Sequence, residues 1–228
     1  MQPERKPIFC YVTDSRALDP GRAPSAGETS SKNSSPVAAR ALLEKIRNAP
    51  AAGIDWVQIR EKHLETRVLM DLVRLAVAAS RDTHTSVLVN DRLDVALATG
   101  AAGVHLGEAS LPVETVADWR RSAGRPEFLI GASCHSLEAA QMAESAGADY
   151  ICFGPVFATP SKAAFGAPQG IERLREVCRS VRIAVLAIGG ITVENSRACI
   201  AAGAAGVAAI RLFQEPADVS AVVNRLRK

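Results

Sequence analysis

Eight short apolar segments alternate with helical segments along this chain of 228 residues, and the alternation predicts a single (β/α)8 barrel. The apolar segments are rich in Val, Ile, Leu and Ala, as expected for parallel strands that are buried on both faces. Gly53, Gly100, Gly147 and Gly203 each lie between a helical segment and the next apolar one, where glycine can end a helix in the left-handed conformation. An open doubly wound sheet is the alternative, but open sheets usually contain fewer strands.

The strands are predicted where short apolar or β-branched runs are bounded by glycine or polar residues. In chain order they are residues 8–13, 56–60, 86–90, 103–106, 128–132, 150–154, 183–188 and 206–210. Helices are predicted between them, where apolar residues recur every three or four positions. They include residues 36–48, 67–80, 112–122, 137–146, 171–180, 193–201 and 217–226, and a further helix begins near Leu93.

Two strand-to-helix connections are longer than the others. Residues 14–36 are rich in Ser, Pro, Gly and Asn, so this loop is either mobile or a lid over the site. Residues 155–170 form the second long loop, after the sixth strand. In a barrel, both loops lie at the C-terminal face, which carries the active site. The whole chain is expected to form one domain, because no shift in composition marks a boundary.

The composition excludes several classes of protein. Hydrophobic residues make up 48% of the chain and charged residues 22%, which is too apolar for a disordered chain and too charged for a membrane protein. The net charge of +3 predicts neither a nucleic-acid nor a membrane partner. The five cysteines are odd in number and contain no CxxC pair, so no disulfide framework or structural zinc site is expected. The N-terminal residues do not resemble a signal peptide, which predicts a cytoplasmic protein, and a homo-oligomer is compatible with the sequence.

Two cations and an amide are expected at the end of the second strand. Side chains alternate along a strand, so Gln58, Arg60 and Lys62 share one face. Positive groups near a barrel mouth require a counter-charge, and an anionic ligand such as phosphate would supply it. The alternative is that Arg60 and Glu61 form an ion pair at the strand end.

A carboxylate follows the third strand. Asp91 could hold Mg²⁺, which binds one or two carboxylates together with phosphate oxygens and water. Alternatively, Asp91 caps the helix that begins near Leu93. A second acid would be expected after the fourth strand, where Glu108 is the nearest carboxylate and Ser110 is a weak ligand. His105 lies within that strand, and we expect it to be a core histidine with satisfied hydrogen bonds.

The fifth strand leads into two further candidates. Ser133 and His135 share a face, and His135 is the best candidate for proton transfer because a histidine pKa lies near neutrality. The alternative is that this segment only begins a helix, with Ser136 as its cap. Cys134 points to the opposite face and is expected to be inert.

The last candidates could bind an anion with hydroxyl, ammonium and backbone groups. Thr159, Ser161 and Lys162 lie in the loop after the sixth strand, where they could surround a phosphate, although the loop could equally be only solvated. Gly189 and Gly190 end the seventh strand, and glycines there let backbone N–H groups approach a phosphate at a helix N-terminus.

Together these segments resemble the thiamine phosphate synthases and their close relatives, the thiazole tautomerases. The segments that carry the resemblance are residues 58–62, 89–91, 103–107, 147–150, 154–162 and 188–191. The likeness covers nearly the whole chain and implies a (β/α)8 barrel. A synthase joins hydroxymethylpyrimidine diphosphate to a thiazole phosphate and releases diphosphate.

The resemblance also implies roles for the candidate residues. Asp91 would hold Mg²⁺, and Ser133 would lie near the pyrimidine. The pyrimidine diphosphate would contact Gln58, Arg60, Lys62, Asn90 and Lys162, and the thiazole phosphate would contact Thr159, Ser161 and the backbone of Gly189 and Gly190. The lysines would stabilise the leaving diphosphate.

Two departures from the synthase pattern leave other readings open. Ser110 stands where synthases carry a second Mg²⁺ aspartate, which the tautomerases also lack, and Arg211 replaces a small serine beside the thiazole phosphate. Arg211 could clamp that phosphate or crowd the site. A tautomerase would use His135 as general acid and base without metal. A third reading is a protein that binds a phosphorylated ligand without turnover.

Overall fold

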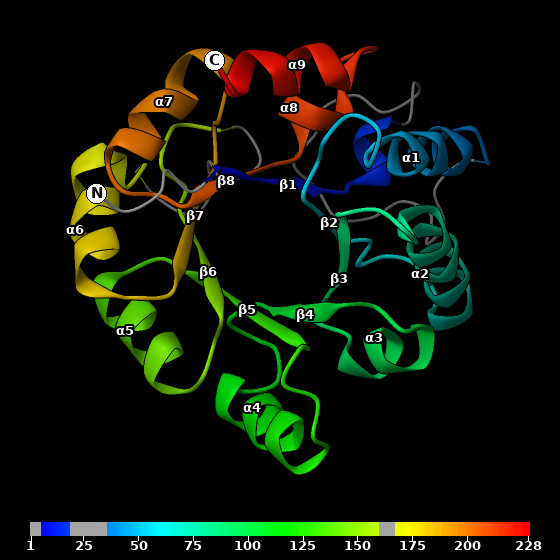
Figure 1. The fold of residues 1–228 in the computed structure, drawn as a ribbon, viewed down its shortest axis with the longest axis horizontal. Coiled ribbons are helices and arrows are strands. Elements are labelled where there is room, and N and C mark those ends of the chain that lie inside the picture. The colour runs from blue at the N-terminus through cyan, green and yellow to red at the C-terminus, as the bar shows by residue number, and fades with distance from the viewer. Residues whose placement is uncertain (1–5, 19–35, 160–166) are drawn as a thin grey trace.

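The computed structural model describes residues 6–18, 36–159 and 167–228. In this part of the chain, eight parallel strands close into a barrel in the order β1 to β8, and β8 pairs with β1. Figure 1 shows the ring of strands in the centre and the helices around it. This is the (β/α)8 barrel that the alternating segments predict.

The strand bounds agree with the predicted ones to within two residues. The strands are β1 Ile8–Val12, β2 Trp56–Ile59, β3 Ser86–Asn90, β4 Gly103–Leu106, β5 Leu129–Cys134, β6 Tyr150–Phe153, β7 Ala184–Ile188 and β8 Gly206–Ala209. The largest difference is at β5, which continues through Ser133 and Cys134. Ser133 is therefore held by the sheet and does not belong to a loop.

The described helices also follow the prediction. They are α1 Pro36–Asn48, α2 Thr66–Ser80, α3 Leu93–Thr99, α4 Val113–Ser122, α5 Leu137–Ser145, α6 Gly170–Ser180, α7 Val193–Ala201, α8 Arg211–Gln214 and α9 Val219–Leu226. A short 3-10 helix, η1 (Ser15–Leu18), follows β1, and neither it nor α8 was expected. Both are too short to show a helical repeat in the sequence.

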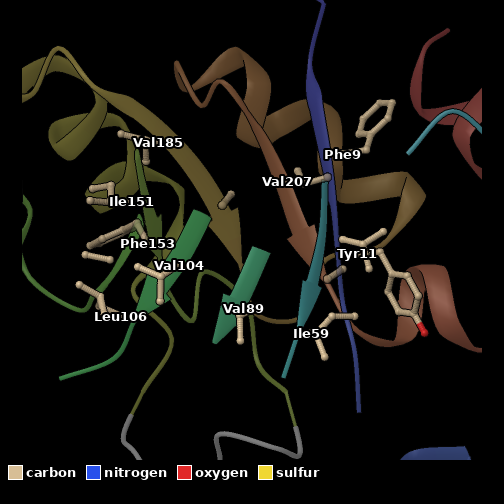
Figure 2. Close-up of a cluster of buried hydrophobic side chains, with 14 of the residues drawn as sticks. Phe9, Tyr11, Ile59, Val89, Val104, Leu106, Ile151, Phe153, Val185 and Val207 are labelled. Carbon is tan, nitrogen blue, oxygen red and sulfur yellow. The ribbon is translucent and has the colours of Figure 1, made fainter. Parts of the chain in front are cut away.

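Side chains from each strand alternate between two apolar layers. The larger layer lies between the sheet and the helices, and Figure 2 shows part of it, including Val104, Ile151 and Phe153. The smaller layer lies inside the barrel and contains Tyr150 together with small or medium side chains, among them Cys10, Leu88, Cys152, Leu186 and Ala208.

The predicted helix ends and cysteine states are confirmed. Gly53, Gly100, Gly147 and Gly203 all have positive φ angles, between 71° and 105°, where a side chain would be strained. All five cysteines are free, and burial raises the pKa of the Cys134 thiol to about 12. In the described part of the chain, no helix is long and apolar enough to cross a membrane.

Candidate active site

A chain of side chains connects the C-terminal ends of β2 and β3. Gln58 is buried, and its amide Nε2 donates to Asn90 Oδ1 at 2.8 Å. Asn90 Nδ2 in turn donates to Asp91 Oδ2 at 2.6 Å. The predicted residues on these two strands are therefore brought together, and the hydrogen bonds fix which amide atoms face which partner.

Asp91 is the centre of this network. Lys62 Nζ lies 3.2 Å from its Oδ2, and the backbone N–H of Gly107 donates to its Oδ1 at 3.1 Å. The Ser110 hydroxyl also donates to Oδ1. Burial by itself raises the pKa of the Asp91 carboxyl, but the hydrogen bonds from Ser110, Gly107 and Lys62 outweigh burial and hold this pKa below its usual range. Asp91 is therefore ionised at neutral pH.

The backbone at Asp91 adopts an uncommon conformation. Its φ angle is +61°, and Arg92 N donates to Asn90 O at 2.8 Å, which closes a tight three-residue turn. This turn directs the carboxylate toward the loop after β4. The expectation that Asp91 caps α3 is wrong, since Arg92 holds the N-cap position and no side chain caps that helix.

Arg60 and Glu61 do not pair with each other. Glu61 is buried on the opposite side, where its carboxylate accepts hydrogen bonds from the Ser15 N–H and from the Ser15 hydroxyl at 2.6 Å. Burial raises the pKa of Glu61. The Arg60 guanidinium makes no hydrogen bond or ion pair with any described residue. The alternative reading of an Arg60–Glu61 pair is therefore wrong, and Arg60 remains available to an anion.

The surroundings of Asp91 can hold a divalent cation only with help from a ligand. No group of three or more His, Cys, Asp or Glu side chains suited to a metal occurs among the described residues. Glu108, the nearest acid in the sequence, lies 3.9 Å from His135 Nε2. One carboxylate and the Ser110 hydroxyl fit Mg²⁺ if phosphate oxygens and water complete its shell.

His135 follows β5 and faces the barrel mouth with one ring nitrogen. Its Nδ1 contacts the Gly154 carbonyl oxygen, which can only accept a hydrogen bond. Nδ1 therefore carries a proton, and Nε2 lies 3.9 Å from Glu108 Oε1. The helix cap is a separate feature, because Ser136 caps α5 by accepting from Ala139 N at 3.0 Å.

His105 is a buried histidine whose two ring nitrogens both have partners, as expected. Its Nε2 lies 2.9 Å from Ser133 Oγ, and its Nδ1 lies 3.0 Å from Tyr150 Oη. Burial lowers the pKa of His105 to about 4, so the ring is neutral at pH 7. Sequence reasoning missed Tyr150. The contact depends on the strand register, which places His105 and Tyr150 on either side of Gly131 on β5.

The opposite side of the mouth uses backbone groups. Gly189 and Gly190 have φ angles of +95° and +65°, and the N–H groups of Gly189, Gly190 and Ile191 donate to no described residue. Successive free N–H groups of this kind can bind an anion. The N-terminus of α7 does not share this role, because Thr192 caps it in a capping box.

Arg211 reaches across to the same region. Its Nη2 donates to Thr159 Oγ1 at 3.4 Å, so a residue after β8 contacts one after β6. The other two candidates of that loop, Ser161 and Lys162, lie outside the described residues. The predicted side chains thus form two groups at the mouth, one around Asp91 and one near Gly189.

Comparisons with known proteins identify the family. A sequence model described as "Thiamine monophosphate synthase" matches residues 30–213. The chain belongs to this family. It is 42% identical to a "Thiamine-phosphate synthase" of Moorella thermoacetica, over 83% of this chain and 88% of that one. A protein of the same name from Methanoregula boonei is 45% identical over 83% of this chain and 86% of that one.

A solved structure of a family member agrees with the fold. "Thiamine phosphate pyrophosphorylase" from Pyrococcus furiosus superposes with a TM-score of 0.77 at 33% identity, and the match covers 98% of this chain and 95% of that one. The structure places the Ser110 hydroxyl on Asp91 and the Arg211 guanidinium beside Thr159.

Proposed function

We propose that this chain is a thiamine-phosphate synthase, which joins hydroxymethylpyrimidine diphosphate to a thiazole phosphate and releases diphosphate. The proposal is supported by two separate groups of cationic side chains and N–H donors at one barrel mouth. One contains Arg60 and Lys62 beside Asp91, and the other contains Arg211 and the N–H groups near Gly189, which donate to no described residue. Two phosphorylated substrates require two such groups.

The pyrimidine diphosphate would bind on the side of Asp91. Gln58 and Asn90 would orient it through their amides, and Ser133 would contact the ring. Arg60 and Lys62 would pair with diphosphate oxygens. Lys62 can turn from Asp91 to the substrate, since 60% of its side chain is exposed. Lys162 would join this group as a third cation.

The thiazole phosphate would bind on the side of Gly189. The N–H groups of Gly189 and Gly190 would hold its phosphate, with the Thr159 and Ser161 hydroxyls and the Arg211 guanidinium. This arrangement would direct the thiazole nitrogen toward the pyrimidine's exocyclic carbon. The carbon–oxygen bond to diphosphate then breaks, diphosphate leaves with the electron pair, and the thiazole nitrogen forms the new carbon–nitrogen bond.

Mg²⁺ would bind at Asp91 and would add positive charge beside the leaving diphosphate. Because Ser110 supplies a hydroxyl in place of a carboxylate, the cation would depend on substrate oxygens for most of its ligands. Ser110→Asp should therefore lower the Mg²⁺ concentration needed for half-maximal rate, by about tenfold. An unchanged Mg²⁺ dependence would show that position 110 does not contribute to the metal site.

The synthase reaction can be tested directly. Purified protein with both substrates and Mg²⁺ should form thiamine phosphate and diphosphate in equal amounts, and a chelator should stop the reaction. Absence of thiamine phosphate with authentic substrates would reject the proposal.

The arrangement of His135 favours a second candidate function, thiazole tautomerisation. Its Nε2 could exchange a proton with a thiazole carboxylate phosphate. The aromatic isomer would then form without metal, and His135→Ala should slow its formation by about two to four orders of magnitude. If the protein only binds phosphorylated ligands, they will raise its melting temperature while neither product forms.

A further inference from the structure

A glycine allows two buried side chains to meet across the middle of the barrel. In the strand register, His105 on β4 lies beside Gly131 on β5, and Gly131 lies beside Tyr150 on β6. A Cβ atom on Gly131 would overlap the Tyr150 ring. Because Gly131 has no side chain, the Tyr150 phenol crosses β5 and its Oη reaches His105 Nδ1 at 3.0 Å.

The other His105 nitrogen contacts a residue one layer closer to the mouth. Ser133 lies two residues after Gly131 on the same face of β5, and its Oγ is 2.9 Å from His105 Nε2. Tyr150, His105 and Ser133 thus form a hydrogen-bonded line from the buried interior to the half-buried Ser133. Trp56 packs on the Tyr150 ring, with 4.7 Å between ring centroids, and helps to hold the phenol in place.

The direction of these hydrogen bonds follows from the groups available. His105 is buried, and its two ring nitrogens face two hydroxyl groups, so a ring with one N–H and one lone pair can satisfy both. Tyr150 is 1% exposed, and its hydroxyl has no other acceptor among the described residues. If Nδ1 carried the proton, the phenol hydrogen would be buried without an acceptor, which is unfavourable.

The phenol therefore donates to Nδ1, and Nε2–H donates to Ser133 Oγ. The Ser133 hydroxyl hydrogen then points away from His105. It has no acceptor among the described residues, so it is available to a ligand in the mouth.

We propose that Tyr150 and His105 are positioning residues that fix Ser133 as a hydrogen-bond donor, so that the site selects an aromatic ring with an unprotonated nitrogen at Ser133. The assignment of that ring to the pyrimidine substrate rests on the proposed synthase function. A ring with C–H at this position, or with a protonated nitrogen, would leave the hydroxyl without an acceptor.

The direction of the hydrogen bonds can be tested without catalysis. In protein labelled with ¹⁵N-histidine, nitrogen chemical shifts and couplings report which ring nitrogen is protonated, and His105→Gln identifies the His105 signals. We expect the Nε2–H form in the wild type and in Ser133→Ala, because Tyr150 still donates to Nδ1. Tyr150→Phe removes that donor, so the Nε2–H form should remain while the Nδ1 chemical shift moves toward that of a lone pair without a hydrogen bond. An Nδ1–H form in the wild type, or an unchanged Nδ1 shift in Tyr150→Phe, would overturn the proposal.

Substrate selection is tested with two analogues of the pyrimidine diphosphate, in each of which one ring nitrogen is replaced by C–H. The wild type should use one of them about tenfold less well, through a higher KM at nearly unchanged kcat. Ser133→Ala should lose this discrimination, and Tyr150→Phe should reduce it. His84→Gln, in an exposed loop, should keep it.

Full discrimination in Ser133→Ala would contradict the selective role of Ser133. If the authentic substrates give no thiamine phosphate, the synthase proposal fails, whereas the NMR measurement still decides whether Tyr150 and His105 orient Ser133.

Discussion

The interior of the barrel has two unlike halves. In the half formed by β2 to β5, which we call the polar half, the inward side chains include two hydrogen-bonded pairs, Gln58 with Asn90 and His105 with Ser133. In the half formed by β6 to β8 and β1, the apolar half, the inward side chains include Val12, Cys152, Leu186 and Ala208.

This difference determines how each half can recognise a ligand. The polar half offers donors and acceptors of fixed direction, which suits a heteroaromatic ring with a charged group. The four side chains named for the apolar half carry no hydrogen-bonding oxygen or nitrogen, and the Tyr150 hydroxyl of β6 is already bonded to His105. An anion there therefore depends on backbone N–H groups and on residues beyond the strand ends, such as Arg211. Substitutions that remove a hydrogen-bonding group should therefore weaken ligand binding in the polar half. Substitutions that add a side chain near the backbone N–H groups should weaken ligand binding in the apolar half.

The largest expected effect follows from Asp91→Asn. The substituted amide would face the donors Lys62 and Asn90 with an N–H₂ group or would turn it toward Gly107 and Ser110, so at least one hydrogen bond is lost in either orientation. We expect kcat/KM for thiamine phosphate formation to fall about a thousandfold, because the cation site and the network are lost together. Steady-state kinetics at saturating Mg²⁺ measures this.

Asp71→Asn is the matched control for this substitution. Asp71 is an exposed acid on α2 that pairs with Arg74 at 3.1 Å, so its loss should leave activity within about twofold. If both variants lost activity equally, this result would contradict the central role of Asp91 in the site.

The next effect concerns the stability of the polar half at low pH. Burial lowers the pKa of His105 from 6.5 to about 4, so between these values the unfolded chain binds a proton that the folded chain does not. Stability is therefore lost as the pH falls through this window. The free energy of unfolding of the wild type, relative to His105→Gln, should decrease by about 3 kcal/mol between pH 7 and pH 4. Urea unfolding at each pH measures this difference, and a constant difference would mean that His105 titrates normally.

Much of the polar half could be predicted from the sequence. Strand alternation places Gln58 beside Arg60 and Lys62 on one face, and the ends of neighbouring parallel strands must meet, which brings Asn90 and Asp91 to them. The left-handed turn at Asp91 could not be predicted, because a positive φ is uncommon outside glycine. That turn decides that Asp91 binds the loop after β4 and does not cap α3.

The contacts of Tyr150 and Glu61 could not be predicted for a different reason. Both depend on which residues of distant segments are neighbours, which requires the register of the closed barrel. Glu61 appeared to be a partner for Arg60 because the two are adjacent in sequence. Adjacent strand residues face opposite sides, and its partner is Ser15, 46 positions away.

A smaller effect is expected from adding a methyl group just after β7, at the end of the apolar half. In Gly190→Ala, the new Cβ would lie 2.6 Å from Ala158 O and 2.7 Å from Phe157 Cβ, at a φ of +65°. The loop after β6 must then shift. We expect the free energy of unfolding to fall by about 1–2 kcal/mol, and the KM for thiazole phosphate to rise more than the KM for the pyrimidine diphosphate.

Gly124→Ala is a control that introduces backbone strain without a new side-chain contact. Gly124 has a φ of +62°, but nothing lies within 4 Å of its added Cβ. Gly124→Ala should show a similar decrease in the free energy of unfolding, because of backbone strain, and no change in either KM. A KM change in Gly124→Ala as large as that in Gly190→Ala would mean that the apolar half does not hold the thiazole phosphate.

The division of the site is tested most directly by measuring both KM values in two variants, Lys62→Ala after β2 and Arg211→Ser after β8. We expect Lys62→Ala to raise the KM for the pyrimidine diphosphate about tenfold and Arg211→Ser to do the same for the thiazole phosphate, each with little effect on the other substrate. If both variants raised the KM for the same substrate, this result would contradict the division of the site.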